Sequence, residues 1–284
     1  MKSLINTIGI IGSGQMGRGI AQVAAQSGFS VKLFDIDEAK LKDAITFISS
    51  LLDKGIAKGK WDSEAKLKTL AAIKTTANMT EVAQSDLIIE AATENKQIKF
   101  QIFKDLDRLA PAQTILASNT SSISITEIAA QTNRPHLVAG MHFMNPVPVM
   151  KLVEGIKGLI TSDETFSQIK AVTEKMSKVF IAANDRPGFA VNRILMPMIN
   201  EAVFALYENV ASAKDIDDAM KLGTNQPMGP LELADFIGLD TCLAIMEVLF
   251  EGFGEDKYRP CPLLKQYVTA KRLGKKVGQG FYQY

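Results

Sequence analysis

The feature that most constrains this chain is a glycine-rich turn near its start. Residues 12–17 read Gly-Ser-Gly-Gln-Met-Gly. They follow an apolar run at 7–11 that predicts a buried strand, and they lead into residues 16–27, which predict a helix. Asp35 ends the next predicted strand, 21 residues beyond Gly14. Glycines permit a tight turn and close approach of a ligand, and a helix amino terminus attracts phosphate. The pattern therefore predicts a dinucleotide site in an α/β fold.

Asp35 also indicates which dinucleotide would bind. A carboxylate at this position accepts hydrogen bonds from the adenosine ribose hydroxyls and repels a 2′-phosphate. Residues 34–37 contain no arginine that would neutralise such a phosphate. We therefore predict NAD rather than NADP as the cofactor. The predicted cofactor contacts in the turn are Gly12, Gly14, Gln15, Met16 and Gly17.

The order of the predicted elements divides the chain into two domains. Up to residue 185, short apolar runs alternate with helical stretches, which is typical of a doubly wound, mainly parallel sheet. Further strands are predicted at 31–34, 87–90, 115–117, 137–142, 152–153 and 179–181. Beyond the Arg-Pro-Gly at 186–188, apolar residues recur at helical spacing in 189–207, 216–222 and 231–250. We predict a nucleotide-binding domain at 1–185 and an all-helical domain at 186–284.

One segment of the first domain departs from this rhythm. Residues 37–70 are long for a single crossover between strands and are rich in lysine. We expect a projecting helical pair. Each lysine taken alone is most simply a solvated side chain, but together they would form a patch for an anionic ligand.

Composition limits the partners and the compartment. The 32 Lys and Arg residues against 31 Asp and Glu residues leave a formal net charge of +1. That balance provides no general attraction to nucleic acid or to membranes. Cys242 and Cys261 alone make neither a disulfide framework nor a zinc site, so we expect a reducing compartment and no metal. No signal peptide or apolar run of membrane-spanning length stands out, and we expect a soluble cytoplasmic protein.

Two histidines are available for proton transfer, His136 and His142. They flank the predicted strand at 137–143, so they should lie about 20 Å apart at roughly 3.3 Å per residue. Ligands of doubly wound sheets bind at the carboxyl ends of the strands. His142 lies at that end, and we expect His136 on the surface. Other polar residues expected at carboxyl ends of strands are Glu90, Glu94, Ser118, Asn119, Thr120, Ser121, Ser122, Asn145 and Glu154.

Position alone leaves two interpretations of these groups open. A carboxylate beside an imidazole fixes its tautomer and stabilises the imidazolium, so Glu154 would support His142 in moving the proton of an alcohol during hydride transfer. Alternatively, Glu154 is a surface acid of a strand, and the Ser/Thr run at 118–122 caps a short helix that begins near Thr126.

Several ordered motifs resemble those of the L-3-hydroxyacyl-CoA dehydrogenase family. They are Asn-Thr-Ser-Ser at 119–122, His-Phe-Met-Asn-Pro at 142–146, Lys-Leu-Val-Glu at 151–154, Asp-Arg-Pro-Gly-Phe-Ala-Val-Asn-Arg at 185–193, Gly-Pro-Leu-Glu-Leu-Ala-Asp at 229–235 and Gly-Gln-Gly-Phe-Tyr at 278–282. The resemblance spans residues 8–284. It implies a Rossmann-type domain, a helical domain that closes the cleft and forms a homodimer, and reversible, NAD-dependent oxidation of (S)-3-hydroxyacyl-CoA to 3-oxoacyl-CoA. The compact length favours 3-hydroxybutyryl-CoA, and with it a place in fatty acid and butanoate metabolism.

The resemblance also implies a role for each matched residue. His142 would be the general base in oxidation and the general acid in reduction, and Glu154 would orient it. Ser121 and Asn192 would contact the substrate near its reacting oxygens. The implied cofactor contacts outside the turn are Asp35, Glu94, Lys99, Ser121, Asn145 and Lys276, and the implied CoA contacts are Lys54 and Lys60.

Two other functions are compatible with the same architecture. A sugar-acid dehydrogenase of the gulonate type needs no remote phosphate clamp, so the lysine-rich segment favours CoA over it. A non-catalytic nucleotide-binding structural protein has no physical need for His142, Glu154, Ser121 and Asn192 together. An apolar stripe in the second domain is expected in its core or at a dimer face. It consists of Leu195, Met196, Met198, Ile199, Val203 and Leu206.

Overall fold

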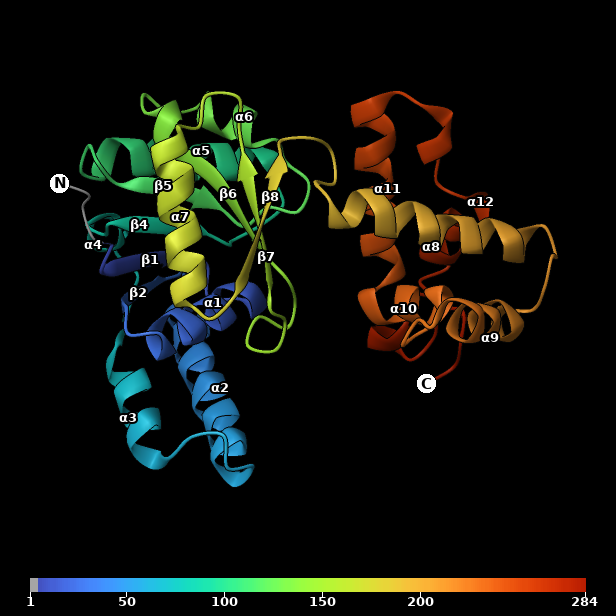
Figure 1. Ribbon diagram of the computed structural model, residues 1–284, viewed down its shortest axis with the longest axis horizontal. Helices are drawn as coiled ribbons and strands as arrows, with labels where there is room; N and C mark the ends of the chain where they lie inside the picture. Colours follow the sequence, from blue (N-terminus) through green and yellow to red (C-terminus); the bar gives the residue numbers. More distant parts are fainter. Residues whose placement is uncertain (1–4) are drawn as a thin grey trace. The chain divides into compact units, whose positions relative to one another are not determined.

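The computed structural model describes residues 5–284, and the chain divides into two compact units between Asp185 and Arg186 (Figure 1). The first unit is built on a sheet with the strand order β3-β2-β1-β4-β5-β6-β7-β8. The strands are β1 (Thr7–Ile11), β2 (Ser30–Phe34), β3 (Ile73–Thr76), β4 (Leu87–Glu90), β5 (Ile115–Ser118), β6 (Val138–Phe143), β7 (Leu152–Lys157) and β8 (Val179–Asn184). The predicted α/β fold with a mainly parallel sheet is confirmed.

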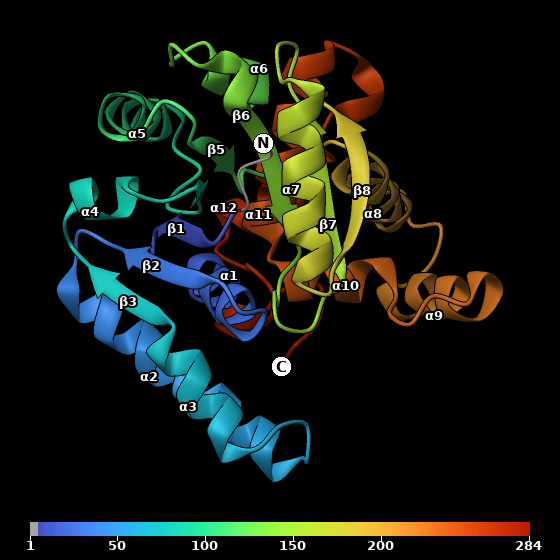
Figure 2. The same cartoon turned by 60° about the vertical axis from the view of Figure 1, so that its left-hand side comes forward.

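The strand pattern follows from apolar runs that are buried on both faces. Every residue of β4, β5 and β6 is buried, as expected for central strands of a parallel sheet. The helices of this unit are α1 (Gln15–Gln26), α2 (Glu38–Ala57), α3 (Ser63–Ala71), α4 (Met79–Ala83), α5 (Lys96–Leu109), α6 (Ile125–Ala129) and α7 (Asp163–Lys175). Figure 2 shows α7 lying along β7 and β8.

Two features of the sheet differ from the sequence prediction. β3 was not predicted, because its Ile-Lys-Thr-Thr sequence is short and largely polar at the edge of the sheet. Among the described strands, β6 and β7 are the one antiparallel pair. The segment 144–151 that joins them is too short for a crossover connection, and antiparallel pairing is the arrangement that such a link permits.

The lysine-rich segment forms α2 and α3, which extend away from the sheet (Figure 1). Trp61, in the link between them, donates a hydrogen bond from its indole nitrogen to the Leu52 carbonyl at 3.0 Å. Its ring lies against Gly55, where a Cβ atom would come within 2.3 Å of the indole. Trp61 therefore packs the link that follows α2 against that helix.

The second unit is helical, with α8 (Val191–Tyr207), α9 (Ala213–Thr224), α10 (Pro230–Ile237), α11 (Leu239–Phe253) and α12 (Pro262–Thr269). The apolar stretch at 231–250 is divided between α10 and α11 at Gly238, whose φ of 105° interrupts the helix. Met196, Ile199 and Val203 of the α8 stripe are buried in the core of this unit, and Leu195 and Leu206 pack partly buried against it. None of the helices within 5–284 has the length and apolar character to cross a membrane.

Two buried carboxylates fasten the C-terminal tail to this helical core. Asp235 of α10 accepts hydrogen bonds from the backbone N–H groups of Phe281 and Tyr282, both at 2.9 Å, and from the Tyr284 hydroxyl at 3.2 Å. Asp217 of α9 accepts a hydrogen bond from the Tyr282 hydroxyl at 2.6 Å. The tail is therefore an integral part of the second unit.

We expect Asp235→Asn to destabilise the second unit by about 2 kcal/mol, because an amide nitrogen would face one of the two tail N–H groups and leave it unpaired. Urea unfolding followed by circular dichroism measures this change. Asp256→Asn is the matched control, since Asp256 is exposed in the 3₁₀ turn η2 (Asp256–Tyr258). Equal midpoints for the two variants would contradict the expectation.

Candidate active site

The three glycines of the turn differ in what a side chain would meet at each position. Gly12 has a φ of 97°, and a Cβ atom there would lie 2.7 Å from the Ala91 carbonyl oxygen. A Cβ atom at Gly17 would lie 1.8 Å from the Gly12 oxygen. The fold itself therefore requires these two glycines. Gly14 has a φ of −63°, and a Cβ atom there would meet no protein atom within 4 Å. Nothing inside the protein requires Gly14 to be glycine, which is expected where a ligand approaches the backbone.

The start of α1 also differs from its neighbours. Within residues 5–185, each of the other α-helices begins with a side chain that accepts a hydrogen bond from the first turn. These caps are Asp37, Asp62, Asn78, Asn95, Ser124 and Ser162. α1 begins at Gly14 and has no side-chain cap. Its first N–H groups and the positive end of its dipole can therefore bind an anion such as a pyrophosphate.

Asp35 follows β2 beside this turn. Its Oδ2 accepts hydrogen bonds from both the backbone N–H and the hydroxyl of Ser13 at 2.8 Å, and its Oδ1 accepts one from the Asp37 N–H at 3.2 Å. Burial opposes ionisation, but the hydrogen bonds from Ser13 and Asp37 and the charge of Lys40 together outweigh it and hold the pKa of Asp35 below its ordinary value. Sequence reasoning missed Ser13, because the motif leaves that position unspecified.

His142 and Glu154 form a buried pair. They lie opposite each other on β6 and β7, and His142 Nδ1 is 2.8 Å from Glu154 Oε2. The exposed fractions of the two residues are 7% and 0%. The expectation that Glu154 lies at the carboxyl end of its strand is wrong. It lies within β7, and the antiparallel pairing of β7 with β6 brings it to the histidine. The alternative of a surface acid is also wrong.

A second buried pair, the ion pair of Glu90 and Lys99, lies at the carboxyl ends of β4 and β5. Glu90 is fully buried and accepts hydrogen bonds from the Lys99 ammonium group, from Ser118 Oγ at 2.8 Å and from the Ala92 N–H at 2.9 Å. Lys99, on α5, is also buried and lies 3.7 Å from Glu94. The Lys99 ammonium group therefore forms ion pairs with the carboxylates of both Glu90 and Glu94.

Glu94 accepts hydrogen bonds from the Ser/Thr run that follows β5. It accepts hydrogen bonds from Ser121 Oγ at 2.7 Å, from the Ser121 N–H at 2.5 Å and from Thr120 Oγ1 at 2.9 Å. The structure thus brings together Glu94, Lys99 and Ser121. The alternative that this run caps the following helix is wrong, because Ser124 caps α6.

Asn145 connects the histidine strand to the glycine turn. It follows β6 in the segment 144–151, and its Oδ1 accepts a hydrogen bond from Gln15 Nε2 at 3.0 Å. Asn119 ties β5 to the same edge by accepting a hydrogen bond from the Phe143 N–H at 2.8 Å. His136 is exposed in η1 (Pro135–Leu137) before β6, as predicted.

Of the remaining predicted residues, two lie on the projecting helices of the first unit and two lie in the second unit. Lys54, in the last turn of α2, and Lys60, in the link to α3, are exposed on the projecting helices. Asn192 is buried in the first turn of α8 in the second unit. Lys276, in η3 (Lys275–Val277), forms an ion pair with Asp240 at 2.6 Å within that unit.

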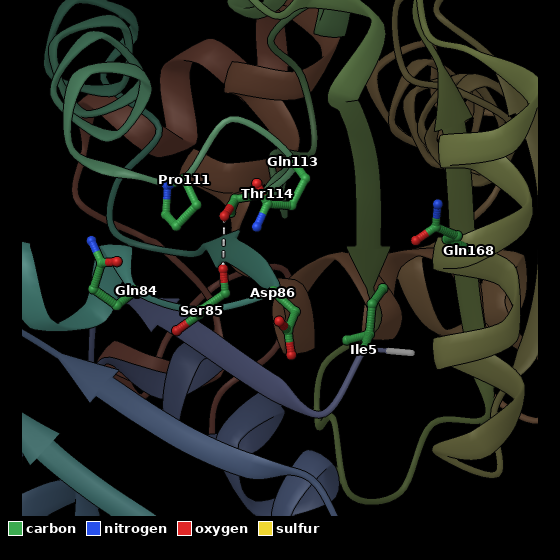
Figure 3. Close-up of a pocket in the computed structure, with 8 residues that line it drawn as sticks. All are labelled: Ile5, Gln84, Ser85, Asp86, Pro111, Gln113, Thr114 and Gln168. Carbon is green, nitrogen blue, oxygen red and sulfur yellow. Dashed lines mark hydrogen bonds between the residues drawn. The ribbon is translucent and has the colours of Figure 1, made fainter. Parts of the chain in front are cut away.

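A separate pocket of about 140 Å³ lies at the amino-terminal edge of the sheet (Figure 3). Most of the residues that line it directly precede β1, β4 or β5 in the sequence. Its carboxylate, Asp86, accepts hydrogen bonds from the backbone N–H groups of Asn6 and Thr7 at 2.9 and 2.8 Å. Its hydroxyl, Thr114 Oγ1, donates to the Ser85 carbonyl at 2.9 Å. These polar groups serve the fold, and the pocket lies at the opposite edge of the sheet from His142.

Comparison with known proteins covers the whole described chain. A family model described as "3-hydroxyacyl-CoA dehydrogenase, NAD binding domain" matches residues 7–186, and one described as "3-hydroxyacyl-CoA dehydrogenase, C-terminal domain" matches residues 188–284. A 3-hydroxybutyryl-CoA dehydrogenase of Bradyrhizobium diazoefficiens is 51% identical over 284 residues, which are 100% of this chain and 97% of that protein. The mitochondrial hydroxyacyl-coenzyme A dehydrogenase of Homo sapiens is 44% identical over 291 residues, covering 100% and 92%.

A solved structure is similar over the same length. The crystal structure of (S)-3-hydroxybutyryl-CoA dehydrogenase from Ralstonia eutropha matches with a TM-score of 0.97 at 49% identity and covers 99% of each chain. The chain therefore belongs to the 3-hydroxyacyl-CoA dehydrogenases, a family of NAD-dependent oxidoreductases, and its first unit is the NAD-binding domain of that family.

Proposed function

We propose that this protein catalyses the reversible oxidation of (S)-3-hydroxyacyl-CoA to 3-oxoacyl-CoA with NAD, and that 3-hydroxybutyryl-CoA is its substrate. The observation that carries the proposal is the buried His142–Glu154 pair, at the same edge of the sheet as the glycine turn. The full-length relatives named for this substrate support the choice of thioester.

The residues at the strand ends fit the cofactor. Gly14 leaves room at the backbone, α1 presents unpaired N–H groups, and Asp35 presents a charged carboxylate that disfavours a 2′-phosphate. We propose that Gly12, Gly14, Gln15, Met16 and Gly17 hold the pyrophosphate. Further contacts are proposed from Asp35, Glu94, Lys99, Ser121, Asn145 and Lys276. When bound, NAD accepts the hydride from the alcohol carbon.

His142 then carries the proton. We propose that the imidazole takes the proton of the substrate hydroxyl through Nε2 in oxidation and returns it to the ketone oxygen in reduction. Glu154 holds Nδ1 and stabilises the imidazolium, whose charge would be costly in so buried a place without a carboxylate. The strand pairing fixes both side chains before substrate arrives, so little reorganisation accompanies the transfer.

Ser121 and Asn192 are the proposed contacts to the reacting oxygens. The Ser121 hydroxyl donates to Glu94 at 2.7 Å. A serine hydroxyl can rotate, so we propose that it turns to donate to the reacting oxygen of the substrate, whose own proton goes to His142. Lys54 and Lys60 are proposed to bind the CoA phosphates. We further propose a cytoplasmic homodimer that acts in fatty acid and butanoate metabolism, with the helical unit as both substrate and dimer domain.

The proposed reaction is tested by absorbance at the NADH band, with purified protein and acetoacetyl-CoA. NADH and NADPH are supplied in separate reactions. We expect rapid loss of NADH and much slower loss of NADPH, because Asp35 repels the 2′-phosphate. Protein that binds NADH yet oxidises neither cofactor would contradict the proposal and favour a sugar-acid dehydrogenase or a non-catalytic protein.

The His142→Gln variant should lower kcat at least about 100-fold while keeping its affinity for NADH, because general acid–base catalysis is lost and the glycine turn is untouched. Glu154→Gln should lower kcat in the same way and to a smaller extent. His136→Gln is the matched control, since it removes an exposed histidine at the other end of β6. The assigned role fails if His142→Gln turns over like the control.

Gly14→Ala should weaken NADH binding at least about tenfold, which corresponds to 1.4 kcal/mol. The added methyl group would occupy the space proposed for the pyrophosphate. Unfolding stability should change by less than about 0.5 kcal/mol, because the methyl group meets no protein atom. Fluorescence titration with NADH measures the affinity. Gly223→Ala, also without neighbours at its Cβ position, is the control, and similar NADH affinities for the two variants would refute the placement.

A further inference from the structure

The segment 144–151 joins the two halves of the candidate site. It leaves β6 directly after His142 and Phe143, and it returns to the sheet at β7. Its Asn145 receives the hydrogen bond from Gln15 of the glycine turn. Its Val147 is buried against α1 at Gly19, where a Cβ atom would come within 2.9 Å of the valine. The position of Asn145 therefore depends on how firmly this segment is held.

Lys178, just before β8, also holds the segment. Its ammonium group donates hydrogen bonds to the carbonyl oxygens of Val147 and Met150, the latter at 2.7 Å. The residue is 9% exposed, and no ion pair among the described residues involves it. Burial lowers the pKa of Lys178. A buried ammonium without a carboxylate is costly, and here two main-chain oxygens replace water as its acceptors.

The contacts of Lys178 are centred on one turn of the backbone. The N–H groups of Val149 and Met150 both donate to the Pro146 carbonyl, at 2.9 and 3.0 Å, and this closes the turn. The next residue along the chain, Val179, donates its N–H to the Lys151 carbonyl at 2.8 Å. The side chain of Lys178 thus fixes the middle of the segment, while the backbone of β8 fixes its end.

We propose that Lys178 is a positioning residue for the cofactor, which clamps the segment 144–151 so that Asn145 meets Gln15 at the glycine turn. The inference rests on the proposed NAD-dependent function. Without the ammonium group, two carbonyl oxygens lose their donor and the turn loosens. His142 stays in place, because β6 and β7 pair along their length. Loss of the clamp should therefore weaken cofactor binding and leave proton transfer intact.

The test uses the full-length Lys178→Met variant, in which the side chain keeps its approximate length and loses its donors. Hydrogen–deuterium exchange of the peptide spanning 144–151 should become faster, with the Val149 and Met150 amides most affected. The Kd for NADH, from fluorescence titration, should rise about tenfold. The KM for acetoacetyl-CoA and the shape of the pH profile of kcat should stay as in the unmodified protein.

Lys170→Met is the matched control. Lys170 lies on α7 of the same unit and is largely exposed. Among the described residues its ammonium group pairs only with Glu174, at 3.8 Å, and makes no hydrogen bond or ion pair with the segment 144–151. It should change neither the exchange of 144–151 nor the Kd for NADH. If Lys178→Met does not yield folded protein, Lys178→Arg, which keeps donors, is measured in the same way. In any folded variant, faster exchange of 144–151 without a weaker NADH complex overturns the proposal.

A double-mutant cycle with Asn145→Ala separates the proposed route from a general loss of stability. If Lys178 acts through Asn145, the Lys178→Met change should have little further effect on the NADH Kd once Asn145 is removed. Additive effects would overturn the proposal. The exchange and NADH titrations need no turnover. A failure of acetoacetyl-CoA reduction in the unmodified protein would therefore count against the proposed function alone.

Discussion

The buried His142–Glu154 pair depends on one reversal of direction in the sheet. Six strands run parallel, and β7 then returns alongside β6 with His142 opposite Glu154. Side chains of directly opposed residues in an antiparallel pair lie on the same face, so the backbone register alone sets the imidazole against the carboxylate. A slip of one residue would turn Glu154 to the other face. The His142–Glu154 pair is thus specified by main-chain hydrogen bonds.

The glycine turn at 12–17 contains glycines that are needed for different reasons. Gly12 and Gly17 let the strand, turn and helix pack together, and their neighbours leave no space for a side chain. Gly14 has no such neighbours. The same six-residue motif therefore combines two glycines that the fold requires with a third that serves the proposed cofactor contact. The two kinds of glycine are told apart by what surrounds each Cβ position, which the motif itself does not reveal.

Much of the architecture and part of the site could be predicted from the sequence. Apolar runs revealed seven of the strands, although one of them, β8, is largely exposed. The position of His142 at the end of such a run placed it at the carboxyl edge of the sheet. The direction of β7 was not predicted, although the eight residues between the predicted strands at 137–143 and 152–153 are too few for a crossover connection. β3 is too short and polar to stand out. Lys178 precedes an edge strand, where a lysine normally reaches solvent, and only the fold shows that it is buried.

The uncapped start of α1 has a consequence for the energetics of the whole first unit. The other α-helices of this unit complete their first turns with their own side chains, whereas the first N–H groups of α1 are left for water or a bound anion. A ligand that binds only the folded state adds RT ln(1 + [L]/Kd) to stability. The resistance of this unit to heat and proteolysis is therefore coupled to the dinucleotide concentration around it.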